Sequence, residues 1–383
     1  IVHNMEQPLR AEEQLSQVLR VTTWNILSPV IDVGKMFPFV GEDVTGQEHR
    51  SAVISQHIES LETDVWLLQE LPHTQLEELL AGPAQGFDSY FVHEGVEGAA
   101  AIELGKIDHA VHRPQPGGDL EQGRSPPLRE RGVAVLWKRG LFESVTKMPE
   151  IRTEAGNPAA MIKARWRNRD IVLGSKHMDA LGCPPAATRC QAQLKDFCRA
   201  ASSFAADREE NAGDRPPPAV VLGGDCNLTP SAPAIEEVCE YGYILASSDL
   251  HKPTCFAVTG STRLDHIFVQ GSVTGIATKI PECDAGHPCT VVPCFHQIQI
   301  LMDWIGVSRP NIKIPCQMAV TCLLAPVFIA AAVCCFCIPA PLSLRRCRWA
   351  LEHYGSDHLP VTVTIAPGED RRQEQALGQL ARD

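Results

Sequence analysis

Carboxylate, amide and imidazole side chains stand at the ends of short apolar strings in this sequence. The strings are TWNIL, LLQE, SKHMD, GGDCN, RLDHIF and GSDHLP. Their polar residues are Asn25, Glu70, His177, Asp225, Asn227, Asp265, Asp357 and His358. Carboxylates bind hard divalent cations, imidazole transfers protons near neutral pH, and amides donate hydrogen bonds to anions, so these groups could together hydrolyse a phosphoric ester. Each string alone is weak evidence, because Asp followed by Gly or Asn is more often a turn former.

Apolar periodicity predicts the elements that would position these side chains. The predicted strands are 19–25, 64–70, 133–137, 161–166, 171–175, 219–225, 263–269 and 360–366. The predicted helices are 47–61, 184–206 and 235–241, and the Gly- and Pro-rich stretch 95–132 reads as a surface loop. The polar residues thus fall at or just beyond strand ends, which is how α/β scaffolds place their sites.

Taken in order, the six strings resemble the endonuclease/exonuclease/phosphatase superfamily over residues 19–270 and 352–366. The resemblance implies an α/β (α+β) fold of the DNase-I-like kind, a four-layer sandwich of two packed mixed β-sheets flanked by helices. The strings WNILSP and WLLQE, with the long helix after His177, look closest to the deadenylase-like and nocturnin-like members. Two positions depart from the usual pattern, since Cys226 stands where the superfamily has an aromatic residue and His266 where it often has Tyr.

The same resemblance implies a metal site. Glu70 would be the principal ligand of a Mg²⁺ ion, for which Mn²⁺ could substitute, and Asn25 and Asp357 would support the same metal region. Magnesium prefers oxygen ligands and often takes only one or two carboxylates, which agrees with this small set.

Five further residues would carry the catalytic steps, again by resemblance. His358 would pair with Asp265, which holds the tautomer of the imidazole and favours its protonated form. Asp225 would orient or deprotonate the attacking water, and Asn227 and His177 would donate hydrogen bonds to the phosphoryl oxygens. Cys226 should point into the core, away from Asp225 and Asn227, because side chains alternate along an extended segment.

Composition limits the partners and the compartment. The chain has 383 residues, 44% of them hydrophobic, and a formal net charge of −12. A sizeable core can be buried, but no global basic field gathers nucleic acid, so any such affinity must be local. None of the fifteen cysteines precedes Cys183, and they show no regular pairing. We therefore expect a reducing compartment, the cytoplasm or the nucleus.

The domain organisation contains one conspicuous interruption. We expect a catalytic domain at 18–366, preceded by a polar leader at 1–17 and followed by a polar tail at 367–383. A Cys-rich apolar insertion at 275–350 divides this domain. Its most apolar part, 316–338, is long enough to cross a bilayer.

A lone membrane crossing would separate Asp265 from Asp357, so three other interpretations of the insertion stay open. It could be a hairpin with 290–307 as a costly first span, an interfacial or re-entrant anchor, or a functionally neutral excursion, which its composition favours. Its residues Cys283, His287, Cys289, Cys294 and His296 could also bind zinc, but they lack a CxxC pair.

The sequence therefore predicts a magnesium-dependent phosphodiesterase that acts on RNA or a nucleotide. One alternative is a membrane-associated, sphingomyelinase-like phosphodiesterase, which the apolar insertion suggests. An alternative of another class is a catalytically inactive binding scaffold. A scaffold would be expected to have lost some of the site residues, whereas all of them are present here.

Overall fold

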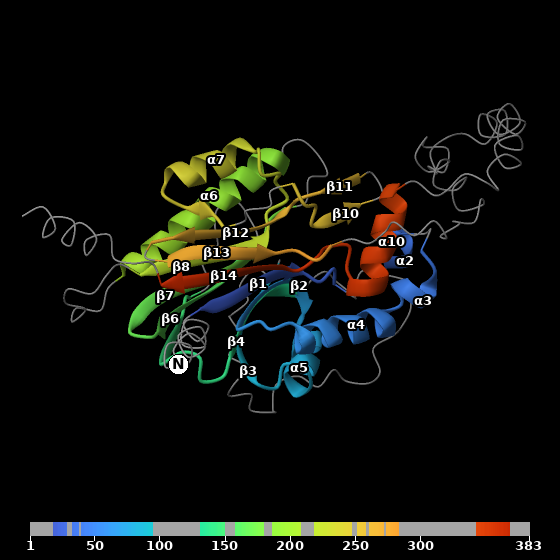
Figure 1. Cartoon of the computed structure of the whole chain (residues 1–383), viewed down its shortest axis with the longest axis horizontal. Coiled ribbons are helices and arrows are strands. Elements are labelled where there is room, and N and C mark those ends of the chain that lie inside the picture. Colours follow the sequence, from blue (N-terminus) through green and yellow to red (C-terminus); the bar gives the residue numbers. More distant parts are fainter. Residues whose placement is uncertain are drawn as a thin grey trace, which may run out of the picture.

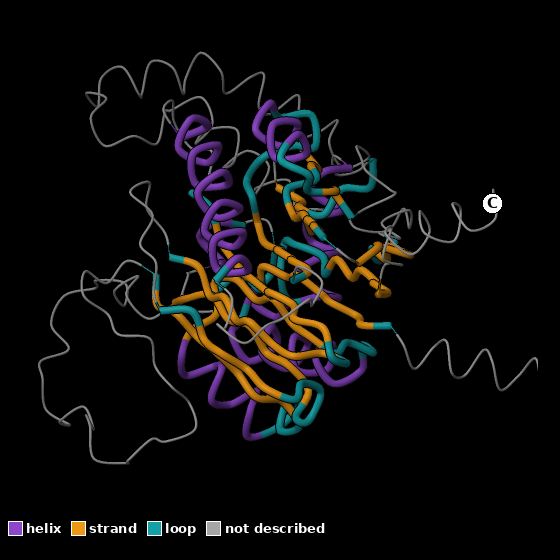
Figure 2. The backbone as a smooth tube through the Cα atoms, turned by 90° about the vertical axis from the view of Figure 1, so that its left-hand side faces the viewer, coloured by secondary structure: helices purple, strands orange, loops and turns teal. Residues whose placement is uncertain are grey.

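The protein is a sandwich of two β-sheets with helices on both outer faces. The structure, a computed structural model, describes residues 18–28, 33–37, 40–94, 131–149, 158–179, 186–207, 218–246, 251–257, 260–271, 273–282 and 342–367. Figure 1 shows the order of the layers, with α6 and α7 on one side of the sandwich and α4 and α5 on the other. Figure 2, turned by 90°, shows the strands stacked between the purple helices. The predicted fold class is confirmed.

The first sheet has six strands in the order β13-β14-β1-β2-β4-β3. In that order the strands are Val273–Lys279, Val361–Pro367, Leu19–Asn25, Val65–Pro72, Arg131–Lys138 and Phe87–His93. β1 and β2 run parallel, with Asn25 opposite Gln69. The pairing of β2 with β4 shifts register between Leu68 and Leu71, which is a bulge that contains Gln69 and Glu70.

The second sheet also has six strands, in the order β5-β6-β7-β8-β12-β9. In that order they are Ser144–Lys147, Ala159–Trp166, Arg169–His177, Ala219–Asp225, Asp265–Gln270 and Ile244–Leu245. The parallel pairing of β7 with β8 sets His177 beside Asp225, and the antiparallel pairing of β8 with β12 sets Asp225 beside Asp265. A separate hairpin joins β10, Cys255–Ala257, to β11, Gly260–Thr262.

Alternation along the strands builds the three apolar layers. In β1, Val21 faces the core between the sheets and Trp24 faces the helices of the first sheet. In β8, Val221 faces the same central core and Leu222 faces the helices of the second sheet. Successive side chains of a strand point to opposite faces, so both sheets are apolar on both sides.

The helices follow the same layers. α4, Gln47–Ser60, and α5, His73–Ala81, pack on the first sheet, and α6, Ala186–Ala206, and α7, Pro233–Glu240, pack on the second. The remaining helices are α2, Val33–Met36, α3, Glu42–Thr45, and α10, Leu342–Tyr354. α10 packs against α3 and α4 and leads directly into the Asp357–His358 string.

Two elements correct the borders of the predicted insertion. β13 pairs along its length with β14, and α10 packs on α4, so both belong to the fold although they overlap the range 275–350. Neither was predicted, because Gly275 interrupts the alternation of the strand and because Arg345, Arg346 and Arg348 of the helix read as a charged border of the apolar segment. The apolar part 316–338, the proposed zinc residues, the leader and almost all of the tail lie outside the described residues. Within the described part, no helix is both long and apolar enough to cross a bilayer.

Candidate active site

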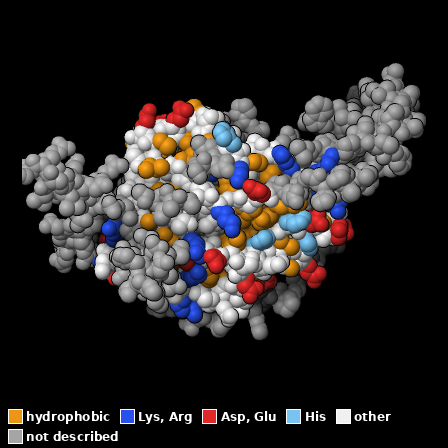
Figure 3. Space-filling view, in the orientation of Figure 1, with side chains coloured by type: hydrophobic (Ala, Val, Ile, Leu, Met, Phe, Trp, Pro, Cys, Tyr) orange, Lys and Arg blue, Asp and Glu red, His pale blue; other side chains and the backbone are white. Residues whose placement is uncertain are grey.

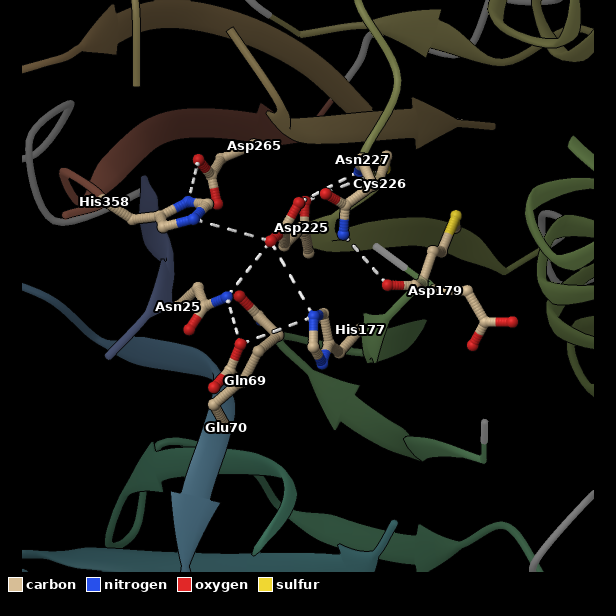
Figure 4. A network of polar contacts seen from close by, with 12 residues as sticks. Asn25, Gln69, Glu70, His177, Asp179, Asp225, Cys226, Asn227, Asp265 and His358 are labelled. Atoms are coloured by element: carbon tan, nitrogen blue, oxygen red, sulfur yellow. Dashed lines mark hydrogen bonds and ion pairs between the residues drawn. The ribbon is translucent and has the colours of Figure 1, made fainter. Parts of the chain in front are cut away.

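The eight predicted site residues come together where the two sheets meet at one edge. Each is within hydrogen-bond or ion-pair distance of at least one other, as the dashed lines in Figure 4 show for most of them. All are buried, with 8% exposure or less. Residues from the two halves of the chain, on either side of the 91 residues that separate Asp265 from Asp357, therefore form one cluster.

Asp265 and His358 form the predicted pair. His358 Nδ1 lies 2.9 Å from Asp265 Oδ2, and Asp265 is fully buried. Burial alone would lower the pKa of His358, but the charge of Asp265 and of other neighbouring groups raises it well above the usual value. His358 is therefore an imidazolium near neutral pH, with Nε2 left to face the site.

Asp225 lies at the centre of the cluster. Its Oδ2 accepts a hydrogen bond from Asn25 Nδ2 at 3.0 Å and is 3.7 Å from His358 Nε2 and 3.8 Å from His177 Nε2. Burial raises the pKa of Asp225, and the neighbouring Asp265 adds to this effect, although the two histidines oppose it. A carboxylate with a raised pKa is a better proton acceptor, which suits a residue beside a reacting water.

Asn227 and Cys226 follow Asp225 in a turn. Asn227 adopts a φ of 50°, a left-handed conformation that Asn tolerates well, and its backbone N–H donates to Asp225 Oδ1 at 2.9 Å. Its Nδ2 donates to Met178 O at 3.0 Å. The predicted inward orientation of Cys226 is confirmed, because its side chain is buried in the core between the second sheet and its helices.

Glu70 is held in an unusual backbone conformation. Its φ is 56°, a strained value for a residue with a long side chain, and it lies in the bulge of β2. Asn25 Nδ2 donates to Glu70 Oε1 at 3.1 Å, and Arg131 Nη1 donates to Oε2 at 3.1 Å. Burial acts to raise the pKa of Glu70, but His177, Arg131 and the Asn25 hydrogen bond outweigh it, so the pKa lies below the usual value.

His177 is one member of a chain of charges that ends at Arg131. His177 Nδ1 is 3.1 Å from Glu94 Oε1, and Arg131 Nε is 2.9 Å from Glu94 Oε2. Burial would lower the pKa of His177, but Glu94 foremost, then Glu70 and Asp225, raise it to about 9. His177 is therefore a cation at neutral pH and contributes positive charge beside Glu70 and Asp225.

Arg50 is a fully buried side chain that joins two loops of the site. Its Nε donates to Gly355 O at 2.7 Å, and its Nη2 donates to Ile26 O and Leu27 O. Burial lowers the pKa of Arg50 to about 10, while the nearby charges of Asp357 and Glu70 raise it. Arg50 thus holds the loop after β1 and the turn before Asp357 through their backbone carbonyls.

The two carboxylates predicted to bind magnesium differ in their oxygen atoms, because both oxygens of Glu70 accept hydrogen bonds from described residues whereas one oxygen of Asp357 does not. Asp357 Oδ1 is buried and accepts no hydrogen bond from the described residues, so it has an oxygen available for a cation. Burial, with a smaller contribution from Glu70, raises the pKa of Asp357 to about 6, although His358 and Arg50 oppose this shift. Asn25 departs from the prediction, because its Oδ1 accepts from Leu27 N at 2.9 Å and only its amide nitrogen faces Glu70.

Among the described residues, two groups of three Cys, His or Asp side chains bring their possible metal-ligating atoms close together. Asp225, Asp265 and His358 form one, and Cys255, Asp357 and His358 form the other, with all donor atoms of each group within 4.8 Å of one another. The first is held together by the Asp265–His358 hydrogen bond and therefore needs no ion.

Four residues around the site were not predicted. Glu94 and Arg131 surround Glu70 and His177, Arg50 holds the loops, and Gln69 Nε2 donates to Ser175 Oγ at 3.0 Å and so links the two sheets below the site. Arg50 had a sequence signal, since it shares a helical face with two buried Ile residues at four-residue spacing. Glu94 also had one, since it directly follows the apolar run that forms β3.

Comparison with known proteins identifies the family of this chain. The model of the endonuclease/exonuclease/phosphatase family matches residues 22–358. No curated protein sequence is similar enough to this chain to count as a match. The chain belongs to the endonuclease/exonuclease/phosphatase family, whose members are hydrolases that act on phosphodiester or phosphate bonds.

Three solved structures illustrate the likeness. ANGEL2, a 2′,3′-cyclic phosphatase in complex with adenosine-2′,3′-vanadate, has a TM-score of 0.54 at 12% identity, covering 92% of this chain and 96% of its own. A family protein from Bacteroides vulgatus has a TM-score of 0.51 at 13% identity, covering 91% and 99%. The catalytic domain of human nocturnin with bound sulfate has a TM-score of 0.49 at 13% identity, covering 92% and 94%. The first two show the shared fold.

Proposed function

We propose that this protein is a magnesium-dependent phosphodiesterase that acts on RNA or a nucleotide. The observation that carries the proposal is the closed cluster in which Glu70 and Asp357 supply oxygen atoms on one side and Asp225 and His358 supply acid–base groups on the other. A catalytically inactive scaffold would not need to keep this arrangement of buried charges, which is costly to desolvate.

The metal would be held by Glu70 and Asp357, and Asn25 would orient Glu70 through its amide nitrogen. Mg²⁺, or Mn²⁺ in its place, would neutralise the phosphoryl oxygens when bound. Asn25 also donates to Asp225, so one amide fixes the spacing of the carboxylate that binds the cation and the carboxylate beside the water. The amide would have to rotate to ligate a cation directly.

The proton transfers belong to the second sheet and the loop that approaches it. Asp225, with its raised pKa, would accept a proton from the attacking water. His358, held as an imidazolium by Asp265, would donate a hydrogen bond or proton from Nε2 to the phosphate. His177 would add positive charge to the phosphoryl oxygens. Asn227 would have to release Met178 O before its Nδ2 could reach substrate.

A short or single-stranded substrate agrees best with the surface. On the face in Figure 3, Lys and Arg side chains lie scattered among Asp and Glu side chains, so the described part of that face offers no broad basic track for a long phosphate backbone. The proposal takes the nucleotide class from the resemblance of the motifs and from the adenosine ligand of the structurally similar ANGEL2. A cytoplasmic or nuclear location, and membrane association through 316–338, stay predictions.

An assay panel tests this function. The purified chain is incubated with oligoadenylate, with an adenine nucleotide and with sphingomyelin vesicles, each in Mg²⁺ and in a chelator. We expect magnesium-dependent hydrolysis of a nucleotide substrate, and loss of it in Glu70→Gln. Glu62→Gln is the matched control, because Glu62 is 81% exposed and paired with Arg20 at the far end of β1. Release of phosphocholine alone would transfer the assignment to the sphingomyelinase-like alternative, and no hydrolysis of any substrate would overturn it.

A further inference from the structure

Cys255 is fixed against His358 by the backbone. The two residues form an antiparallel β-bridge, outside the main sheets. On both sides of the bridge the same two segments are joined, because Phe256 N donates to Asp357 O at 2.9 Å and Leu359 N donates to Thr254 O at 2.8 Å. Side chains of bridged residues lie side by side, so Cys255 is held next to the catalytic imidazole and not placed there by a mobile loop.

The donor atoms of Cys255, Asp357 and His358 are close to the spacing of a zinc site. They all lie within 4.8 Å of one another, and His358 Nε2 is 4.0 Å from Asp357 Oδ1. Ligand atoms around a tetrahedral Zn²⁺ ion, with bonds of about 2.0 to 2.3 Å, are separated by about 3.3 to 3.7 Å. Small side-chain rotations would therefore close the site.

The atoms that would bind already face one another, since the Cys255 thiol hydrogen-bonds to His358, whose Nε2 is also 3.7 Å from Asp225 Oδ2. His358 Nδ1 is engaged by Asp265, which leaves Nε2 for a metal and creates the carboxylate–histidine–metal arrangement seen at many zinc sites. Asp357 Oδ1 is buried in a residue only 8% exposed and accepts no hydrogen bond from the described residues. Cys255 is 6% exposed, and its thiol neighbours both groups.

We propose that Cys255, Asp357 and His358 form an inhibitory site for a thiophilic divalent cation such as Zn²⁺. A thiol, an imidazole and one carboxylate suit zinc, whereas magnesium favours oxygen ligands alone. Binding requires the thiol and the imidazole to release their protons to solvent, which the ion itself promotes. Burial raises the pKa of Cys255 to about 11, which lowers the zinc affinity without changing the ligand set.

Inhibition follows from the two ligands that the zinc site shares with the active site. An ion bound here occupies the Asp357 oxygen available to magnesium and the Nε2 atom with which His358 would act. The inhibition rests on the proposed hydrolase function, whereas the binding of zinc does not. The site would make the enzyme sensitive to free zinc without any change of fold.

Cobalt substitution tests the binding site, and a zinc titration of the activity tests the inhibition. Co²⁺ bound to a thiolate shows an intense ligand-to-metal absorption band, so spectra of the wild-type chain and of Cys255→Ala are compared at equal Co²⁺. Because the segment 283–341 contains other cysteines, the difference between these two spectra is the readout. Cys239→Ala is the matched control, since Cys239 is an exposed free cysteine on α7. Circular dichroism confirms that the variants are folded.

We expect Cys255→Ala, but not Cys239→Ala, to lose one thiolate–cobalt band and to bind Zn²⁺ at least about tenfold more weakly in calorimetry. Zinc should inhibit hydrolysis by the wild-type chain, and the concentration for half inhibition, relative to each variant's own rate, should rise only in Cys255→Ala. Equal cobalt spectra for the wild type and Cys255→Ala would overturn the site, even in an active enzyme. A difference band in a chain without hydrolase activity would support the site and contradict the proposed function.

Discussion

The two sheets hold their parts of the active site in different ways. On the second sheet, His177 and Asp225 end neighbouring strands and Asp265 begins the next, so strand register alone sets their spacing. On the first sheet, Glu70 lies in a bulge with a positive φ, and Asp357 lies in a turn before β14. The half of the site that we propose for acid–base catalysis, His177, Asp225 and Asp265, is thus built into regular structure. The half that we propose for cation binding, Glu70 and Asp357, depends on clamping side chains.

Arg50 and His358 hold the site together in two different ways. Arg50 holds the loops of the cation-binding half through three backbone carbonyls, without an ion-pair partner of its own at short distance among the described residues. His358 comes from the same side but hydrogen-bonds to Asp265 on the second sheet. We infer that His358 is one of the points where the halves are joined, together with Asn25, whose amide donates to both Glu70 and Asp225.

The largest effect is expected from separating the halves at His358. His358→Gln should lower kcat by about 10² to 10⁴, the usual contribution of a general acid or base. Asp265→Asn should cost less, because Asp265 would reach the substrate through His358 and not directly. The double variant should be no slower than His358→Gln, since the two residues act as a unit. Steady-state kinetics of the three variants measure this, and additive losses would contradict the pairing.

The second largest effect is expected from Arg50, which holds the loops around Glu70 and Asp357. Arg50→Met removes the donors of three buried carbonyl groups and should lower the free energy of unfolding by at least about 3 kcal/mol. It should also raise the Mg²⁺ concentration needed for half-maximal activity. Arg50→Lys, which keeps the charge but not the fork of donors, should recover part of the loss. Urea unfolding and a magnesium titration give the two readouts, and unchanged stability in Arg50→Met would contradict the clamp.

A smaller effect, which appears only at low pH, is expected from His266 on the second sheet. This imidazole is fully buried, its Nε2 lies 2.8 Å from Leu228 O, and burial lowers its pKa to about 4. The unfolded pKa is about 6.5, so the unfolded chain binds the proton first as the pH falls. The free energy of unfolding is therefore highest above about pH 6.5, and it falls by about 3 kcal/mol as the pH decreases toward 4.

His266→Gln provides the comparison for that prediction, because its amide can still donate to Leu228 O and does not titrate. Urea unfolding of both chains between pH 7 and pH 4 measures the difference. The wild type should lose more stability than the variant over this interval, and parallel curves would show that His266 does not limit the acid stability of the second sheet.

The sequence predicted the acid–base half better than the cation-binding half. Asp225 and His177 end strands with clear apolar runs, so their position at the sheet edge could be read from alternation. Three features of the other half join segments that are distant in sequence, so no local pattern encodes them. They are the bulge at Glu70, the hydrogen bond from Arg50 to Gly355 and the bridge between Cys255 and His358. Asn25 was expected as a ligand, but its amide nitrogen faces the carboxylates because Leu27 N occupies its oxygen.

The unpredicted elements have a similar explanation. β13 and α10 overlap the two ends of the range 275–350, and their membership in the fold depends on their partners β14 and α4. Composition could not separate them from the stretch between them. The pairing of Asp265 with His358, by contrast, was predicted by resemblance to a family whose motifs occur here in order, and the structure confirms it.

Whether Glu70 and Asp357 bind the divalent cation is tested most directly in crystals soaked with Mn²⁺, in which anomalous scattering locates the ion. We expect one strong peak bound by Glu70 and Asp357 oxygens at about 2.2 Å, close to the ligand distance of magnesium, and its loss in Glu70→Gln. A peak on Asp225, Asp265 and His358 instead, or an Asp357 turned away from Glu70, would contradict the division of the site into a cation-binding half and an acid–base half.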